Sequence, residues 1–179
     1  MIAKKSTKEM LADSALELFS QYSIDEITVA DIAANCNIST RTFYNHFRDK
    51  HELITWVYTN KLEKYFDRRP SKISFWGFMR YSAQVVYDNA SFFINVSSYQ
   101  GQNCLQESIL EPMRDMYIRI IRDTYHDKVT EDLYYSITLF LYGMIGYIRQ
   151  LIVTNQIISP EDAVSIFEAG LPGDLKKYL

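Results

Sequence analysis

Residues 24 to 53, IDEITVADIAANCNISTRTFYNHFRDKHEL, decide the fold of this chain. The segment predicts two short helices joined by a tight turn, followed at once by the start of a third helix. Thr28 and Ser39 are typical helix caps, and Asn37 stands at the turn, where Asn tolerates the left-handed backbone conformation. Thr28 is also placed to offer its hydroxyl and backbone N–H groups to a phosphate at the helix N-terminus. The pattern is typical of a helix-turn-helix, whose second helix enters the DNA major groove.

The exposed face of the second short helix is polar, rich in hydroxyls and basic. Arg41 is suited to bond guanine with two hydrogen bonds, and Asn45 to recognise adenine. Tyr44, His46 and Lys50 are better placed for phosphates, which set the orientation of the protein on the duplex. The residues predicted to contact DNA are Thr28, Ser39, Thr40, Arg41, Thr42, Tyr44, Asn45, His46 and Lys50.

The rest of the chain also has helical periodicity, and no stretch alternates as a strand does. We therefore predict an all-α protein of about nine helices: a three-helix head in residues 1–50 and a helical ligand-binding and dimerisation domain in residues 51–179. A long helix over about residues 50–67, ended by Arg68-Arg69-Pro70, connects the two. A short polar tail is expected after Gly173. The other helices are expected at about residues 6–22, 73–88, 91–98, 103–126, 130–154 and 160–169.

Composition narrows the class of protein. The 179 residues carry a net charge of −3, which does not exclude DNA binding because the phosphate-binding surface is a local patch. Cys36 and Cys104 are far apart and have no metal-ligand spacing, so two free thiols and no metal site are expected. The three histidines leave few candidate general bases, so we expect neither an enzyme nor a bound cofactor. No apolar signal-peptide core opens the chain, which favours a reduced, cytoplasmic protein.

The string from Thr42 to Leu53, TFYNHFRDKHEL, together with TVADIA from Thr28, resembles the tetracycline-repressor (TetR) family of bacterial regulators. The resemblance covers about residues 6–55 and implies an all-helical dimer with two DNA-binding heads. Two residues depart from the family pattern. Asn37 stands in the turn where the family often has Gly, and Arg41 stands where a small residue is common. Such a protein is expected to be a repressor released from a palindromic operator by a small molecule. A transcriptional activator and a helical protein-interaction module of the same fold remain alternatives.

The stretch from Leu133 to Val153 is apolar nearly all round, which predicts burial on more than one side. Thr138 and the Arg149-Gln150 pair interrupt it, so we do not expect it to span a membrane. One face can pack within its own domain. The other is expected, together with the helix over residues 160–169, to meet the same two helices of a second copy in a four-helix bundle. A fully buried core helix of a monomer is the alternative. The predicted interface residues are Gly143, Gly146, Tyr147, Val164 and Phe167.

The aromatic and methionine side chains beyond residue 70 suggest a pocket for a small apolar or aromatic effector, although such residues are more often plain core. Arg80, Arg119 and Arg149 lie near apolar stretches, where any of them could bind a carboxylate, or lie on the surface. The expected partners are thus double-stranded DNA with an inverted repeat, a second copy of the chain and this effector. The predicted pocket residues are Trp76, Met79, Tyr87, Phe92, Met113, Tyr117 and Tyr142.

Overall fold

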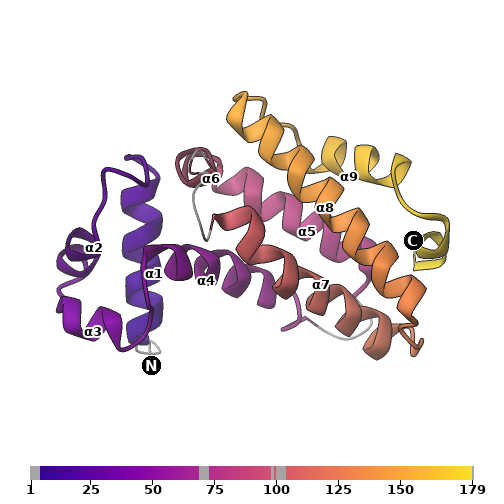
Figure 1. The fold of residues 1–179 in the computed structure, drawn as a ribbon, viewed down its shortest axis with the longest axis horizontal. Coiled ribbons are helices and arrows are strands. Elements are labelled where there is room, and N and C mark those ends of the chain that lie inside the picture. Colours follow the sequence, from indigo (N-terminus) through magenta and orange to yellow (C-terminus); the bar gives the residue numbers. More distant parts are fainter. Residues whose placement is uncertain (1–4, 69–72, 98, 100–103, 179) are drawn as a thin grey trace.

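The structure is a computed structural model, and it describes residues 5–68, 73–97, 99 and 104–178. Within these ranges it contains nine α-helices, one 3-10 helix and no strand, which confirms the predicted all-α class (Figure 1). The elements are α1 (Thr7–Phe19), α2 (Val29–Asn35), α3 (Thr40–Tyr44), α4 (Lys50–Glu63), α5 (Phe75–Asp88), α6 (Ala90–Ser97), α7 (Leu105–Thr124), α8 (Glu131–Val153), α9 (Pro160–Ala169) and η2 (Gly173–Tyr178).

Helices α1 to α3 form the head, and their local signals act as predicted. Thr28 caps α2 in a reciprocal capping box with Asp31, and the Ser39 side chain accepts from the backbone N–H of Thr42 to cap α3. Asn37, in the turn between α2 and α3, has φ 57°. The buried side chains that hold the three helices together include Leu11, Ala15, Ile32, Phe43 and Phe47.

Helix α4 leads from the head into the second domain (Figure 1). It ends at Glu63, four residues before the predicted end, and Arg69 and Pro70 lie outside the described residues. The early end lets Tyr65 turn inward, where its ring lies 5.4 Å from that of Phe78. Burial of a large aromatic side chain offsets the lost helical turn.

Helices α5 to α9 pack around an apolar core that continues into the head. Asn95 on α6 donates to the carbonyl of Phe19 at 2.8 Å, and the Phe19 and Phe92 rings lie 6.4 Å apart. The end of α1 therefore rests directly on α6. The head therefore adjoins the second domain at two places, through α4 and through this contact with α6.

The prediction of a short polar tail after Gly173 is wrong. Residues after Gly173 form η2, whose Leu175 and Tyr178 are buried. The Tyr178 hydroxyl donates to Asp127 at 2.8 Å and Lys177 donates to the same carboxylate at 2.6 Å. These hydrogen bonds, with Lys177 first, lower the pKa of Asp127 to about 2. The short segment lacks a clear period, so the burial of its two large side chains does not show in the sequence.

Candidate functional site

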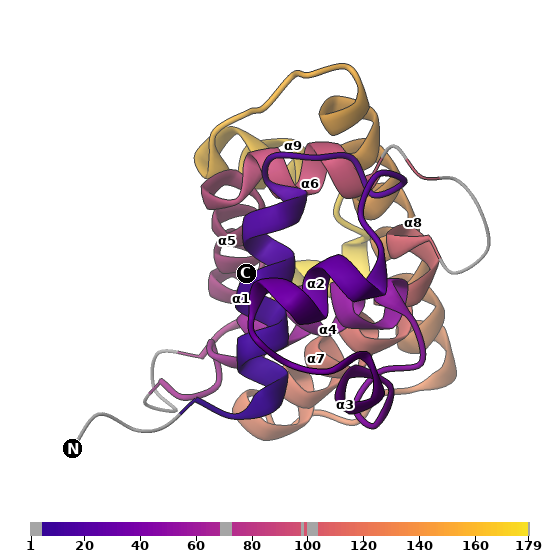
Figure 2. The same cartoon turned by 90° about the vertical axis from the view of Figure 1, so that its left-hand side faces the viewer.

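Helix α3 lies at the end of the molecule away from α5, α8 and α9, and its outer face is open (Figure 2). Phe43 points inward and is fully buried, whereas Arg41 and Asn45 are exposed and Tyr44 is 59% exposed. Arg41 forms no ion pair with any described residue. The face therefore presents one free guanidinium, an amide and a phenol to the solvent, donors suited to base edges and phosphates.

The predicted hydroxyl contacts are partly engaged within the protein. The Thr28 hydroxyl donates to Asp31 Oδ2 at 2.5 Å, and its backbone N–H donates to the same atom at 2.9 Å. The Ser39 and Thr42 hydroxyls lie 2.9 Å apart and share a hydrogen bond. The same residues that cap α2 and α3 thus have fewer donors left for DNA than their sequence positions suggest. Thr40 and His46 have no such hydrogen bond from their side chains among the described contacts.

Lys50 has a structural role that sequence reasoning missed. Its ammonium donates to the carbonyl of Ile24 at 2.6 Å and to that of Ile27 at 2.8 Å. These carbonyls belong to the loop between α1 and α2, so Lys50 ties the start of α4 to the helix-turn-helix. An ammonium has three N–H donors, which leaves one for a phosphate.

Helix α8 carries an exposed apolar stripe along one side. Its members are Tyr135, Leu139, Tyr142 and Gly146, spaced one helical turn apart, and Val153, two turns further on, and we call this set the α8 stripe. Leu139 is 71% exposed and Tyr142 is 62% exposed. By length and composition α8 is also the single described helix apolar enough to cross a membrane, a criterion that core helices of soluble proteins meet as well.

The predicted interface residues divide between two faces. A side chain at Gly143 or Gly146 would meet nothing within 4 Å, and Tyr147 is exposed, so these three positions are open to a partner. Val164 is half-buried. Phe167 is buried and lies against Phe140 and Tyr147 inside the protomer, which removes it from the exposed face. Helix α9 has only 10 residues, so its hydrophobic periodicity does not distinguish its inner side from its outer side.

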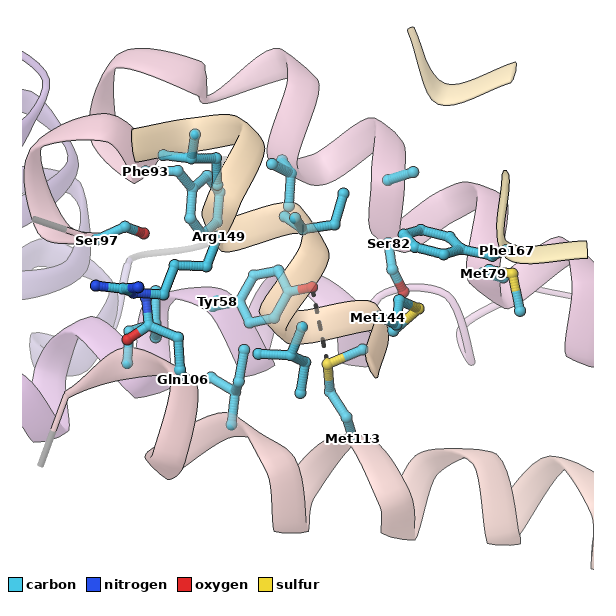
Figure 3. A pocket seen from close by; sticks show the side chains of 17 residues that line it. Tyr58, Met79, Ser82, Phe93, Ser97, Gln106, Met113, Met144, Arg149 and Phe167 are labelled. Carbon is cyan, nitrogen blue, oxygen red and sulfur yellow. Dashed lines mark hydrogen bonds between the residues drawn. The ribbon is translucent and has the colours of Figure 1, made fainter. Parts of the chain in front are cut away.

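A cavity of about 60 Å³ lies among α4 to α9 (Figure 3). Of the predicted pocket residues, Met79 and Met113 line it. The other five do not line it: Phe92 and Tyr117 are buried in the core, Trp76 is half-buried, Tyr142 is exposed, and Tyr87 is exposed and lines a different, smaller cavity. Periodicity identifies a buried face, but the distinction between core and cavity depends on how six helices meet. The described lining consists of Tyr58, Met79, Ser82, Ala83, Val86, Phe93, Ser97, Leu105, Gln106, Ile109, Met113, Met144, Ile145, Ile148, Arg149, Ile152 and Phe167.

The three arginines near apolar stretches have different surroundings. Arg80 pairs with Glu161, and Arg119 pairs with Glu63 at 2.7 Å. Arg149 forms no ion pair with a described residue and lines the cavity. Tyr58, which sequence reasoning missed, projects into the cavity from α4 and is only 4% exposed.

Two family models match the chain over most of its length. Residues 11–55 match the model of bacterial regulatory proteins of the tetR family, and residues 77–171 match that of a transcriptional regulator C-terminal region. The chain belongs to the tetR family. It is a DNA-binding transcriptional regulator, and members of this family act as dimers and are generally not enzymes.

Individual relatives of this TetR regulator agree with the assignment. It is 34% identical over 59 residues to the HTH-type dhaKLM operon transcriptional activator DhaS of Lactococcus lactis, a match that spans about a third (32%) of each chain. The solved structure of a dihydroxyacetone kinase operon activator DhaS has a TM-score of 0.69 at 17% identity, and covers 96% of this chain and 97% of its own. A TetR regulator from Rhodococcus sp. RHA1 has a TM-score of 0.68 at 14% identity, with 91% and 92% covered. These structures share the fold.

Proposed function

We propose that this TetR regulator binds an inverted-repeat operator in the cytoplasm as a homodimer, with α3 of each protomer in a major groove. The observation that carries the proposal is the open outer face of α3, on which Arg41 has no partner within the described protein. Arg41 and Asn45 then contact bases, whereas Tyr44, His46 and the remaining donor of Lys50 contact phosphates. Ser39, Thr42 and Thr28 chiefly hold the helices in place, and Thr40 lies at the edge of the contact.

The α8 stripe supports the dimer. An exposed row of large apolar side chains on a long helix is costly in water, and a two-fold axis brings the same row of a second copy against it. Gly143 and Gly146 allow the two helices to approach closely. Ile166 on α9 is 40% exposed whereas Phe167 is buried, so we propose Ile166 in place of Phe167 as the α9 residue of the interface.

The cavity supports control by a small molecule. Tyr58 lines it from α4, the helix whose first residue, Lys50, holds the loop between α1 and α2. A ligand that binds one position of α4 more tightly than another shifts the population of head orientations. The affinity of the dimer for two half-sites at fixed spacing depends on that orientation.

Repression is the direction we propose, because a dimer bound over a promoter excludes polymerase without needing any further contact. Activation is a second candidate, favoured by the relative that is 34% identical over 59 residues and is named as an activator. Transcription in vitro from the selected promoter, with and without the protein, separates the two. A lower transcript yield supports repression, and a higher yield establishes activation.

Selection of bound duplexes from a random pool tests the DNA-binding proposal. We expect the wild type to enrich an inverted repeat. Arg41→Ala should bind the half-sites about 5- to 150-fold more weakly for each lost bidentate contact. Arg122→Ala is the matched control, since Arg122 is an exposed arginine on α7, far along the chain from α3. Equal weakening by both variants would mean that α3 does not contact the bases.

A further inference from the structure

We infer that the cavity binds a short-chain monocarboxylate whose carbon chain carries an oxygen, with the carboxylate on Arg149 and the chain oxygen on the Tyr58 hydroxyl. The inference deepens the proposed function, on which its regulatory meaning rests, by naming the chemical class of the effector. It depends on four features of the cavity: its charge, its apolar interior, one buried hydroxyl whose described partner is a methionine sulfur, and its size.

The charge of the cavity favours an anion. Arg149 is the only charged side chain among the described residues that line it, and no carboxylate lies beside it there. Arg149 is half-buried and has no ion pair with a described residue. Its neighbour across the cavity, Gln106 on α7, adds an amide donor at the same end (Figure 3). A guanidinium beside an amide matches the two oxygens of a carboxylate.

The other end of the cavity is apolar and adaptable. Met79, Met113 and Met144 gather there with Phe167 (Figure 3). Methionine side chains are flexible and adjust to an irregular ligand surface. Met144 and Arg149 are five positions apart on α8, a rise of roughly 7.5 Å, so a ligand that reaches both is anionic at one end and apolar at the other.

Tyr58 supplies the third feature. Its hydroxyl is buried, and its only described partner is the sulfur of Met113 at 4.0 Å, which is a weak acceptor at the limit of contact. Burial raises the pKa of Tyr58, so the hydroxyl remains protonated and available as a donor at neutral pH. Buried hydroxyls are nearly always hydrogen-bonded, and a ligand oxygen that accepts from Tyr58 completes the site.

The size of the cavity limits the chain. By this measure about 60 Å³ holds roughly four to six water-sized groups, so an acid of about five carbons fills the cavity once the methionines adjust. A small acid therefore fits better than a lipid-length chain, and the position of Tyr58 between the two ends places the second oxygen part-way along the chain.

Calorimetric titration of the full-length dimer tests the inference with matched small molecules. We use valerate, levulinate (the same chain with a ketone oxygen), pentanol, pentylamine and decanoate. Levulinate should bind about two- to tenfold more tightly than valerate, the gain of one neutral hydrogen bond. Both acids should bind more tightly than pentanol, pentylamine and decanoate. Tighter binding of the alcohol or amine would overturn the anionic class, and tighter binding of decanoate would overturn the short chain.

Two variants assign the contacts. Arg149→Gln should weaken both acids by about tenfold or more, because it removes a charge-assisted contact, and leave pentanol unchanged. Tyr58→Phe should abolish the preference for levulinate over valerate. Arg122→Gln and Tyr22→Phe are matched controls on exposed positions. Unchanged affinities in Arg149→Gln, with the dimer mass preserved by light scattering, would contradict the assignment.

Operator binding is measured separately, so that the two proposals can fail independently. Acids that bind through Arg149 without any change in operator affinity would leave the ligand class standing and overturn the effector role. Control of operator binding by an amine or alcohol through the same cavity would leave the proposed function standing and overturn the ligand class.

Discussion

The outer face of α3 and the cavity are both built from side chains on helices, but their residues are distributed along the chain in different ways. The α3 face comes from residues 39–50, one continuous segment, whereas the cavity takes residues from α4 to α9, between Tyr58 and Phe167. Caps and a turn fix the first within a few residues. The second depends on the meeting of six helices, so a site formed locally can be predicted from sequence far better than one formed by packing.

Truncation of Phe43 tests whether the head folds as a local unit. Phe43→Ala should lower the free energy of unfolding by about 3–5 kcal/mol, because it empties a fully buried site that contacts Phe47. Operator binding should be lost. Light scattering should still show a dimer, since α8 and α9 lie in the other domain. A monomeric Phe43→Ala protein would show that the two regions do not act separately.

A charge in the α8 stripe tests the other region. Leu139→Asp places an uncompensated carboxylate at the proposed interface, which costs about 3–5 kcal/mol once buried. The dimer should dissociate at least about 100-fold more readily in sedimentation equilibrium. Tyr22→Asp, at an exposed position in the loop after α1, is a control for added charge. An unchanged mass for Leu139→Asp would place the dimer interface elsewhere.

Lys50 sharpens the comparison because it has two roles in the head: it stabilises the fold, and we propose that it also contacts DNA. Lys50→Met keeps the apolar stem but removes the donors to the carbonyls of Ile24 and Ile27. The free energy of unfolding should therefore fall by about 1–3 kcal/mol. The slope of operator affinity against salt should also decrease by about one contact. Full stability with a reduced slope would mean that Lys50 serves DNA alone.

His51 gives the smallest expected effect. Burial lowers the pKa of His51, whose ring lies 4.5 Å from that of Tyr99. The folded state thus disfavours the protonated ring, so its stabilising contribution is complete above the unfolded pKa of about 6.5 and decreases as the pH falls toward the lower folded value. Urea unfolding across this range should show a steeper pH dependence for the wild type than for His51→Gln. Parallel curves would mean that His51 does not contribute to the pH dependence of stability.

What could be predicted from the sequence follows from this physical difference. Thr28 and Ser39 can be predicted as caps because a cap is a hydrogen bond to an amide three residues away. Conversely, Tyr117 and Phe92 have the residue type and spacing of cavity residues, but they are core. Nothing local distinguishes the two outcomes, since both place an aromatic ring on an inward helical face.

The sequence by itself determined the helical class, the helix boundaries to within a few residues, the turn at Asn37 and the exposed face of α3. All of these depend on interactions between residues close along the chain. Only the tertiary structure decided that Lys50 holds a loop more than twenty residues away and that Arg149, rather than Arg80 or Arg119, lines the cavity. These properties depend on which helices meet, and that is fixed by the packing of the whole core.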